Sequence, residues 1–356
     1  MNGPVLIMAG GTGGHIFPGL SVAQELRERD VAVVWLGGRD GMENRLVPAQ
    51  QIRLETVEFA GVRGKSLATM LLAPLRLFRA VLQARRLISK HSPRSVLSMG
   101  GYAAAPGGIA AWTQRIPLIV HEQNSVAGFS NRLLSKMARH NLTGFPDVFD
   151  GPRAEWVGNP VRRSIAALPV PAERFADRNG PLRILVIGGS QGARTLNAMV
   201  PAALATLAQG RYQVRHQCGS RDVVAVQQAY EKVGVASKVV SFIDDMAEAY
   251  SWADFVVCRA GALTIAELSA AGLGAVLIPF PQAVDDHQTR NARSLVDVGA
   301  ARLIANADVT AISLADLIDD ATSSRARLLA MANAARTLAR PGAIERIVEC
   351  CLEPAP

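Results

Sequence analysis

Cysteines, aromatic residues and long apolar runs are all scarce in this chain of 356 residues. Its four cysteines form no Cys-x-x-Cys pair and have no zinc-like spacing with the six histidines, so we expect free thiols, as in a reduced cytosolic protein. Aromatic residues make up 5% of the chain, and no nucleic-acid-binding motif is interleaved with its arginines. The composition therefore argues against a disulfide scaffold, a zinc site and a nucleic-acid partner.

A signal peptide and a membrane-spanning helix are also missing from the pattern. The first apolar run, Val5–Ala9, follows no basic segment and ends at glycines, which is typical of a β-strand. The uncharged window Ser95–Gln114 contains four glycines and a proline, which suit a spanning helix poorly. We expect that no segment crosses a bilayer.

Acidic residues are absent from residues 59–121, which contain nine basic residues. The first 160 residues hold 18 basic and 11 acidic residues, so they carry +7 of the total net charge of +8. Such a local excess favours an anionic partner, such as a phosphate group or an anionic lipid surface.

A strand, a glycine-rich loop and a helical pattern occur in this order in both halves of the chain. Val5–Ala9 runs into Gly10-Gly-Thr-Gly-Gly14, and Arg183–Ile187 runs into Gly188-Gly-Ser-Gln-Gly192. Further short apolar runs alternate with helical stretches such as Leu75–Ser89. They predict strands at Val31–Leu36, Ser95–Ser98, Leu118–Val120, Glu155–Val157, Val214–Gln217, Val239–Phe242, Phe255–Cys258, Ala275–Pro279 and Ala301–Ile304. The chain is therefore predicted to be α/β, with two doubly wound parallel sheets.

The chain length suits two domains of about 100 to 200 residues each. The turn Gly158-Asn159-Pro160 is the expected hinge. It separates a first domain at residues 1–160 from a second at residues 161–340, and a C-terminal helix at 341–356 is expected to pack back on the first domain. Ligands of such sheets bind beyond the carboxyl ends of the strands, so we expect a binding cleft between two facing domains.

The glycine loops match neither of two common nucleotide-binding motifs. Ile16 stands where Gly-x-Gly-x-x-Gly requires its third glycine, Ser190 stands where it requires the second, and neither loop contains Gly-Lys-Ser/Thr. Loops of closely spaced glycines at helix starts can still hold phosphate through backbone N–H groups, although tight turns alone would also explain them. A third segment, Arg259–Glu267, offers small residues at another helix start and is a candidate diphosphate cradle.

Six motifs follow one another across nearly the whole chain. They are Gly10-Gly-Thr-Gly-Gly-His-Ile-Phe-Pro18, Ser98-Met-Gly-Gly-Tyr102, His121-Glu-Gln-Asn124, Gly158-Asn-Pro-Val-Arg162, Gly188-Gly-Ser-Gln-Gly-Ala193 and Gly261-Ala-Leu-Thr-Ile-Ala-Glu267. Together they resemble the MurG family of N-acetylglucosaminyltransferases. The resemblance implies a GT-B fold of two Rossmann-like domains.

The resemblance also implies an activity and partners. N-acetylglucosamine is expected to pass from UDP-N-acetylglucosamine to the 4-hydroxyl of undecaprenyl-pyrophosphoryl-MurNAc-pentapeptide (lipid I), with inversion, giving lipid II in peptidoglycan synthesis. No metal and no cofactor are expected, and Asp244-Asp245 and Asp285-Asp286 are predicted to be turn or capping residues. The chain is expected to bind the cytoplasmic face of the inner membrane peripherally, with cell-wall and division proteins as further partners.

Donor-site residues are assigned by the resemblance. Ser190 and the backbone near Thr264 are expected at the diphosphate, Glu267 at the ribose and the Ile243 backbone at the uracil. By spacing alone, Glu267 is predicted to be an ordinary solvated helix residue. His287 stands where some relatives have glutamine, so the sugar is read by His287 or Gln288. The full donor set is Arg162, Ser190, Ile243, Ala262, Leu263, Thr264, Ile265, Ala266, Glu267, His287 and Gln288.

The acceptor side contains two candidate general bases, His15 and Glu122. His15 is preferred because its ordinary pKa of about 6.5 leaves much of it neutral near pH 7. A histidine that only bonds the loop backbone is the alternative. The residues expected to position acceptor or sugar are Thr12, Gly13, Gly14, Tyr102 and Asn124.

The stretch Met70–Arg86 places apolar residues beside arginines, inside the window that lacks acids. It suits docking on anionic lipid, and it equally suits a surface helix packed on its own core. The predicted membrane residues are Leu75, Arg76, Phe78, Arg79, Leu82, Arg85 and Arg86.

Three other functions compete with this interpretation. A diacylglycerol glycosyltransferase would share the fold and a membrane acceptor, but His121-Glu-Gln-Asn124 and the first glycine loop favour a muramyl acceptor. A UDP-sugar epimerase would change the free sugar nucleotide without transfer. A non-catalytic nucleotide-sugar-binding membrane adaptor would keep the donor motifs without needing His15 or Glu122.

Overall fold

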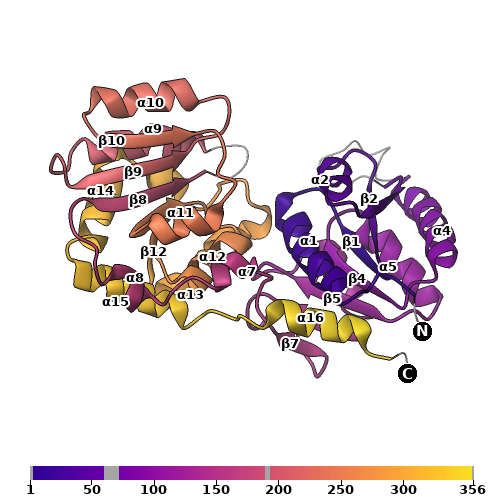
Figure 1. The fold of residues 1–356 in the computed structure, drawn as a ribbon. Helices are drawn as coiled ribbons and strands as arrows, with labels where there is room; N and C mark the ends of the chain where they lie inside the picture. The colour runs from indigo at the N-terminus through magenta and orange to yellow at the C-terminus, as the bar shows by residue number, and fades with distance from the viewer. Residues whose placement is uncertain (1–2, 60–71, 189–192, 355–356) are drawn as a thin grey trace. The chain divides into compact units, whose positions relative to one another are not determined.

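The chain divides into two compact units in the computed structural model, which describes residues 3–59, 72–188 and 193–354 (Figure 1). The N-terminal unit comprises Met1–Val161 and Arg340–Pro356, and the C-terminal unit comprises Arg162–Ala339. The chain leaves the first unit just after the turn at Gly158. That glycine has φ +91°, and a Cβ atom there would clash with the side chain of Arg340, where the chain returns.

Among the described residues, seven parallel strands form the sheet of the N-terminal unit, in the order β3-β2-β1-β4-β5-β6-β7. The strands are β1 (Val5–Ala9), β2 (Val33–Gly38), β3 (Arg53–Val57), β4 (Ser95–Gly100), β5 (Leu118–Glu122), β6 (His140–Thr143) and β7 (Ala154–Trp156). The central strand β1 is buried along its whole length, because helices cover both faces of the sheet. This explains its unbroken apolar sequence.

Six helices of the N-terminal unit lie within the described ranges. They are α1 (Gly13–Glu28), α2 (Glu43–Ala49), α4 (Ala73–His91), α5 (Ala104–Thr113), α6 (Phe129–Leu134) and α16 (Ala343–Leu352). The last of these comes from the C-terminal end of the chain. Its Ile347 and Val348 are buried in the same apolar cluster as Val22 and Leu26 of α1, so α16 is part of the core of the N-terminal unit.

The C-terminal unit repeats the architecture with six parallel strands in its described part, in the order β10-β9-β8-β11-β12-β13. The strands are β8 (Leu182–Ile187), β9 (Tyr212–Gln217), β10 (Ala236–Val240), β11 (Phe255–Cys258), β12 (Gly274–Leu277) and β13 (Ala301–Leu303). The helices are α7 (Arg163–Ala166), α8 (Pro171–Phe175), α9 (Arg194–Leu204), α10 (Val223–Lys232), α11 (Met246–Trp252), α12 (Ala262–Ala271), α13 (His287–Asp297), α14 (Ala311–Ala321) and α15 (Arg325–Arg336), with short 3-10 turns η1 (Val284–Asp286) and η2 (Asn306–Asp308).

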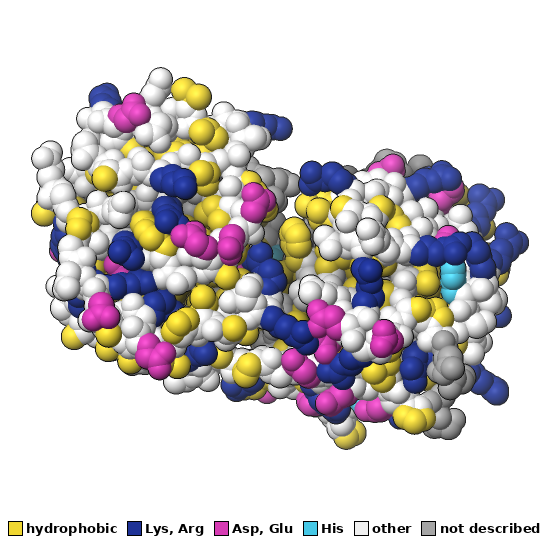
Figure 2. Space-filling view, in the orientation of Figure 1, with side chains coloured by type: hydrophobic (Ala, Val, Ile, Leu, Met, Phe, Trp, Pro, Cys, Tyr) yellow, Lys and Arg dark blue, Asp and Glu magenta, His cyan; other side chains and the backbone are white. Residues whose placement is uncertain are grey.

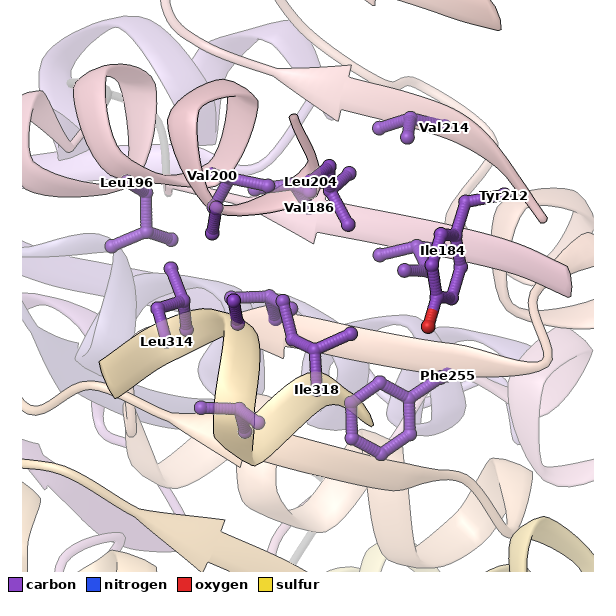
Figure 3. Packing of buried hydrophobic residues seen from close by; sticks show 14 of the residues in the cluster. Ile184, Val186, Leu196, Val200, Leu204, Tyr212, Val214, Phe255, Leu314 and Ile318 are labelled. Carbon is purple, nitrogen blue, oxygen red and sulfur yellow. The ribbon is translucent and has the colours of Figure 1, made fainter. Parts of the chain in front are cut away.

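Leucine, isoleucine and valine side chains from β8, α9 and α14 point toward one another in the core of this unit (Figure 3). Ile184 of β8, Val200 of α9 and Ile318 of α14 are each fully buried. Burying one such side chain contributes about 1.5–3 kcal/mol. The helical spacing predicted after the second glycine loop is therefore the spacing of a core-facing helix.

The predicted fold class is confirmed, since both sheets are parallel and doubly wound. The strands β3 and β6 were not expected from the sequence, because both are short and contain polar side chains. The four cysteines are free, as predicted, and all four are buried. In the ranges that the structure describes, no helix combines the length and apolarity needed to cross a bilayer.

Candidate active site

The first glycine-rich loop joins β1 to α1. Thr12 is the N-cap residue of α1, with extended backbone (φ −128°) and no capping hydrogen bond from its side chain. The N–H groups of His15 and Ile16 donate to the carbonyl of Thr12, whereas those of Gly13 and Gly14 have no hydrogen-bond partner among the described residues. Two amides at the positive end of α1 are therefore available to an anion.

His15 lies half-buried in the first turn of α1. Its Nδ1 lies 3.1 Å from the carbonyl oxygen of Gly10, and because a carbonyl only accepts, Nδ1 carries the proton. The neutral ring then has Nε2 as its acceptor. This atom faces Gly100, since a Cβ there would lie 3.1 Å from Nε2, and Gly100 has φ +100°. The geometry leaves His15 able to take a proton at Nε2.

Glu122 ends β5, and its buried carboxylate is surrounded by donors. Oε1 accepts from the backbone and side-chain N–H groups of Asn124 (3.1 and 3.2 Å). Oε2 accepts from the backbone of Gly128 and from Nδ2 of Asn131, each at 3.0 Å. Asn131 also accepts from Ser98 Oγ of β4 at 2.8 Å. Glu122 therefore organises the loop 123–128 and places Asn124, which favours a positioning role for it.

Glu43, at the start of α2, is a buried carboxylate that the sequence reasoning missed. It accepts from Gly11 N at 3.1 Å and from Gly38 N at 2.8 Å. A Cβ atom at Gly10 or Gly37 would clash with its side chain. Glu43 therefore ties the first glycine loop to the end of β2. In the sequence Glu43 lies close to Gly37, Gly38 and Gly41, but Gly11 lies 32 positions away, so residue spacing gave no signal for this contact.

Tyr102 lies beside the first glycine loop, whereas His121 bonds the turn at Gly158. Tyr102 is exposed, and its ring lies near Gly11. His121 is fully buried, donates from Nε2 to Gly158 O (2.9 Å) and accepts at Nδ1 from Gln123 (3.0 Å). Burial lowers the pKa of His121 to about 4. His121 is therefore neutral near pH 7 and holds the turn that precedes the C-terminal unit.

In the C-terminal unit, α12 begins directly after β11. Gly261 is its N-cap residue, without a side-chain cap, and the first helical bond runs from Ile265 N to Gly261 O at 3.0 Å. The amides of Ala262, Leu263 and Thr264 have no partner within the described part of the chain. These are the backbone groups expected at the diphosphate. The side chain of Ile265 is buried in the interior, so it is not available to a ligand. Ala266, the next residue, is half-buried.

Glu267 lies on α12 with both carboxylate oxygens engaged. Oε1 accepts from Arg162 Nη2 at 2.8 Å, and Oε2 accepts from the hydroxyl of Tyr250 at 3.0 Å. Glu267 is therefore not an ordinary solvated helix residue. The structure also brings together two residues, Arg162 and Glu267, that the resemblance assigned separately to the nucleotide.

The described donor candidates that remain lie in a loop and at a helix start. Ile243 is half-buried between β10 and α11, and Ser190 lies outside the described residues. His287 and Gln288 begin α13, and Oε1 of Gln288 accepts from the backbone N–H of Phe280 at 2.8 Å. Gln288 thus bonds the loop after β12 and keeps its amide N–H groups as donors.

Asp245 caps a helix through its side chain, whereas Asp286 stands at the N-cap of α13 without a capping hydrogen bond to the helix backbone. Asp245 accepts from Glu248 N at 2.9 Å at the start of α11, and Asp286 accepts from Thr289 Oγ1 at 2.7 Å.

One group of potential metal ligands occurs in the described ranges, where donor atoms of His140, Cys350 and Glu353 lie within 4.8 Å of one another. Glu353 already accepts from His140 and pairs with Arg139, and burial raises the pKa of the Cys350 thiol to about 11. These contacts hold the end of the chain to β6.

Apolar and basic side chains share the outer surface of α4. Leu75, Phe78 and Leu82 are exposed by 48%, 60% and 41%. Figure 2 shows Lys and Arg side chains gathered on the part of the N-terminal unit where Figure 1 draws α4. The sequence reasoning missed Trp112 of α5, which is also exposed and precedes Thr113, the acceptor of a hydrogen bond from Arg85. Large apolar residues next to arginines make this surface unlike an ordinary solvated helix face.

Comparison with known proteins identifies the family. The N-terminal domain of glycosyltransferase family 28 matches residues 5–143, and the C-terminal domain of that family matches residues 183–347. A relative from Xanthomonas euvesicatoria is 54% identical over 352 residues, covering 99% of this chain and 81% of the relative. A relative from Alkalilimnicola ehrlichii is 52% identical over 356 residues, covering 100% of both chains. Both are named UDP-N-acetylglucosamine–N-acetylmuramyl-(pentapeptide) pyrophosphoryl-undecaprenol N-acetylglucosamine transferase.

The chain belongs to the MurG family of glycosyltransferases. Its fold is GT-B, as in the crystal structure of Acinetobacter baumannii MurG, which is 39% identical, superposes with a TM-score of 0.86 and matches 98% of each chain. The UDP-GlcNAc 2-epimerase from Neisseria meningitidis has a TM-score of 0.65 at 13% identity. That likeness concerns the fold alone, whereas the MurG likeness extends through the sequence.

Proposed function

We propose that the chain transfers N-acetylglucosamine from UDP-N-acetylglucosamine to the 4-hydroxyl of the muramyl sugar of lipid I, giving lipid II and UDP. The observation that carries this proposal is identity above 50% over essentially the whole chain to relatives named for this transfer. The fold supports it, because both units are parallel sheets and ligands of such sheets bind beyond the carboxyl ends of the strands.

In this proposal the C-terminal unit holds the donor. The amides of Ala262, Leu263 and Thr264 and the positive end of α12 stabilise the diphosphate, which gains negative charge as its bond to the sugar breaks. Glu267 accepts hydrogen bonds from the ribose hydroxyls, and Arg162 lies beside it. The backbone of Ile243 contacts the uracil, and His287 and Gln288 read the sugar, with Ser190 at the diphosphate.

The N-terminal unit holds the acceptor, and His15 is the general base. The muramyl hydroxyl attacks the anomeric carbon, its proton passes to Nε2 of His15, and UDP leaves with the electron pair of the broken bond. The hydrogen bond from Nδ1 to Gly10 O supports this role because it fixes the tautomer in which Nε2 accepts. Glu122, whose carboxylate already accepts four hydrogen bonds, positions Asn124 instead.

The remaining acceptor contacts belong to the same unit. The amides of Gly13 and Gly14, which have no partner among the described residues, are proposed to hold the acceptor pyrophosphate, and Tyr102 and Asn124 to orient the sugars. The surface of α4 is proposed to dock peripherally on anionic lipid at the cytoplasmic face of the inner membrane. Its exposed Leu75 and Phe78 would enter the interface while the arginines contact lipid phosphates.

The proposal is tested by the products of one incubation. The purified chain is supplied with a soluble lipid I analogue and either UDP-N-acetylglucosamine or its epimer UDP-N-acetylgalactosamine, and the acceptor is analysed by mass spectrometry. We expect the acceptor to gain one N-acetylhexosamine with the first donor and little with the second. A changed free sugar nucleotide with an unmodified acceptor would point to an epimerase, and donor binding without any product would point to an adaptor.

A further inference from the structure

Tyr250 is a buried residue that contacts the carboxylate of Glu267, the candidate ribose-binding residue of the C-terminal unit. It lies on α11, is 1% exposed, and donates its hydroxyl hydrogen bond to Oε2 of Glu267 at 3.0 Å. Burial raises the pKa of the Tyr250 hydroxyl well above its ordinary value, so the group is protonated and donates a hydrogen bond near pH 7. Sequence reasoning did not find this residue.

The two partners of Glu267 differ in how firmly they can hold it. Arg162 is 45% exposed, and an exposed ion pair contributes little because water and salt screen it. The Tyr250 hydroxyl is shielded from water, so its hydrogen bond to a charged oxygen is strong, and the packed ring gives it a fixed position. The orientation of the Glu267 carboxylate is therefore decided mainly by Tyr250.

We propose that Tyr250 is a positioning residue that turns the Glu267 carboxylate toward a ribose diol and thereby sets a preference for ribonucleotides over 2′-deoxyribonucleotides. Each carboxylate oxygen has two acceptor positions, so Oε2 can bond Tyr250 and still accept from a ribose hydroxyl. Two neighbouring hydroxyls are accepted together only if the carboxylate plane is held in one orientation. The inference rests on the proposed contact between Glu267 and the ribose.

The test compares the dissociation constants of UDP and 2′-deoxy-UDP, measured by calorimetry on the full chain. In the unchanged protein we expect UDP to bind about tenfold more tightly or better, since one hydroxyl contact to a charged group is lost in the deoxy ligand. Tyr250→Phe should raise the dissociation constant of UDP about tenfold and change that of 2′-deoxy-UDP by less than about twofold. The preference for UDP is then nearly lost. With UDP-N-acetylglucosamine, KM should rise while kcat stays close to its original value.

A matched control separates this effect from the loss of any buried hydroxyl. Tyr230 is also fully buried in this unit, and its hydroxyl contacts His216 rather than Glu267. Tyr230→Phe should keep the preference for UDP. If Tyr250→Phe keeps the preference as well, or if both variants lower it equally, the positioning role is overturned.

Glu267→Gln distinguishes failure of this inference from failure of the ribose assignment. If the unchanged protein binds both nucleotides equally, or if Glu267→Gln keeps the preference for UDP, Glu267 does not bind the ribose hydroxyls. The ribose assignment and the positioning role of Tyr250 are then both wrong. If Glu267→Gln removes the preference and Tyr250→Phe does not, only the role of Tyr250 falls. The double variant provides a second readout that tolerates a modest loss of stability. The dissociation constant of UDP for the double variant should be no higher than that for Glu267→Gln alone. If the losses in UDP affinity from the two single changes add, Tyr250 does not act through Glu267.

Discussion

The two units use the same topology but surround the starts of their helices with different side chains. In the N-terminal unit, the loop after β1 contacts a buried carboxylate, Glu43, and leads into His15, whose Nε2 can accept a proton. In the C-terminal unit, the start of α12 offers backbone amides, and the nearby carboxylate of Glu267 bonds Tyr250 and Arg162. In each unit the fold leaves backbone amides at a helix start without a partner among the described residues, an arrangement that suits an anion. The neighbouring side chains decide whether that place suits proton transfer or nucleotide recognition.

Replacing His15 should have the largest effect of the changes proposed here. It should lower turnover, which depends on the N-terminal unit, without changing nucleotide binding by the C-terminal unit. We expect His15→Ala to lower kcat about 10²- to 10⁴-fold, the range for loss of a general base, while the dissociation constant of UDP stays unchanged. Turnover of a lipid I analogue and calorimetry of UDP measure the two quantities. His91→Gln, which alters a histidine paired with Glu55 elsewhere in the unit, should retain activity. Undiminished turnover by folded His15→Ala would exclude His15 as the base.

Removing the basic side chains of α4 should have the next largest effect, on lipid binding alone. Arg76, Arg79, Arg85 and Arg86 are replaced together by glutamine. Each arginine near an anionic surface contributes about 1 kcal/mol, so affinity for phosphatidylglycerol vesicles should fall up to about a thousandfold in a sedimentation assay.

The control for that experiment removes the same charge from the C-terminal unit. Four exposed basic residues of this unit, Arg221, Lys232, Lys238 and Arg293, are replaced together. Their replacement by glutamine should leave vesicle binding nearly intact, and UDP affinity should be unchanged in the α4 variant. Equal losses in both variants would mean that net charge, rather than the surface of α4, binds the lipid.

Acid should destabilise both units through one buried histidine in each. Burial lowers the pKa of His121 to about 4 and that of His216 to about 3, whereas an unfolded histidine has a pKa of about 6.5. The unfolded chain therefore takes up protons first, so this stability is present above pH 6.5 and is lost as the pH falls toward 4. The loss from His121 is at most about 3 kcal/mol.

Urea unfolding at several pH values measures this loss. His216→Gln should flatten the pH dependence of the C-terminal unit and leave that of the N-terminal unit unchanged. A free energy of unfolding that stays constant from pH 7 to pH 4.5 would contradict the buried, neutral state of both rings.

Changing Glu43 should have the smallest effect and tests whether the N-terminal loop needs its carboxylate. In Glu43→Gln one of the two backbone N–H groups, of Gly11 or Gly38, faces an amide donor instead of an acceptor. We expect kcat to fall about tenfold, because the loop that orients His15 shifts, with unchanged UDP affinity. Glu28→Gln on the exposed end of α1 is the control. Full activity in Glu43→Gln would mean that the Glu43 carboxylate is not needed to orient His15.

Much of the fold could be predicted because its signals are local. Val5–Ala9 and Arg183–Ile187 are apolar on both sides, as central parallel strands require, and the structure has strands at these positions. Arg53–Val57 and His140–Thr143 were missed because their polar residues hide the strand pattern. The ends of strands were less well predicted, since β10 covers Ala236–Val240 rather than Val239–Phe242.

The sequence by itself determined the α/β alternation, the glycine-rich turns and the motifs that identify the family, because each depends on residues close together in the chain. The tertiary structure alone decided which side chains meet. Glu43 reaches Gly11 across 32 positions and Arg162 reaches Glu267 across 105, contacts that depend on how strands are ordered in each sheet. The tertiary structure also decided that Ile265 faces the interior, whereas Glu267, two residues later, faces Arg162 and Tyr250. Parallel sheets bring distant loops to one edge, and linear spacing does not contain that information.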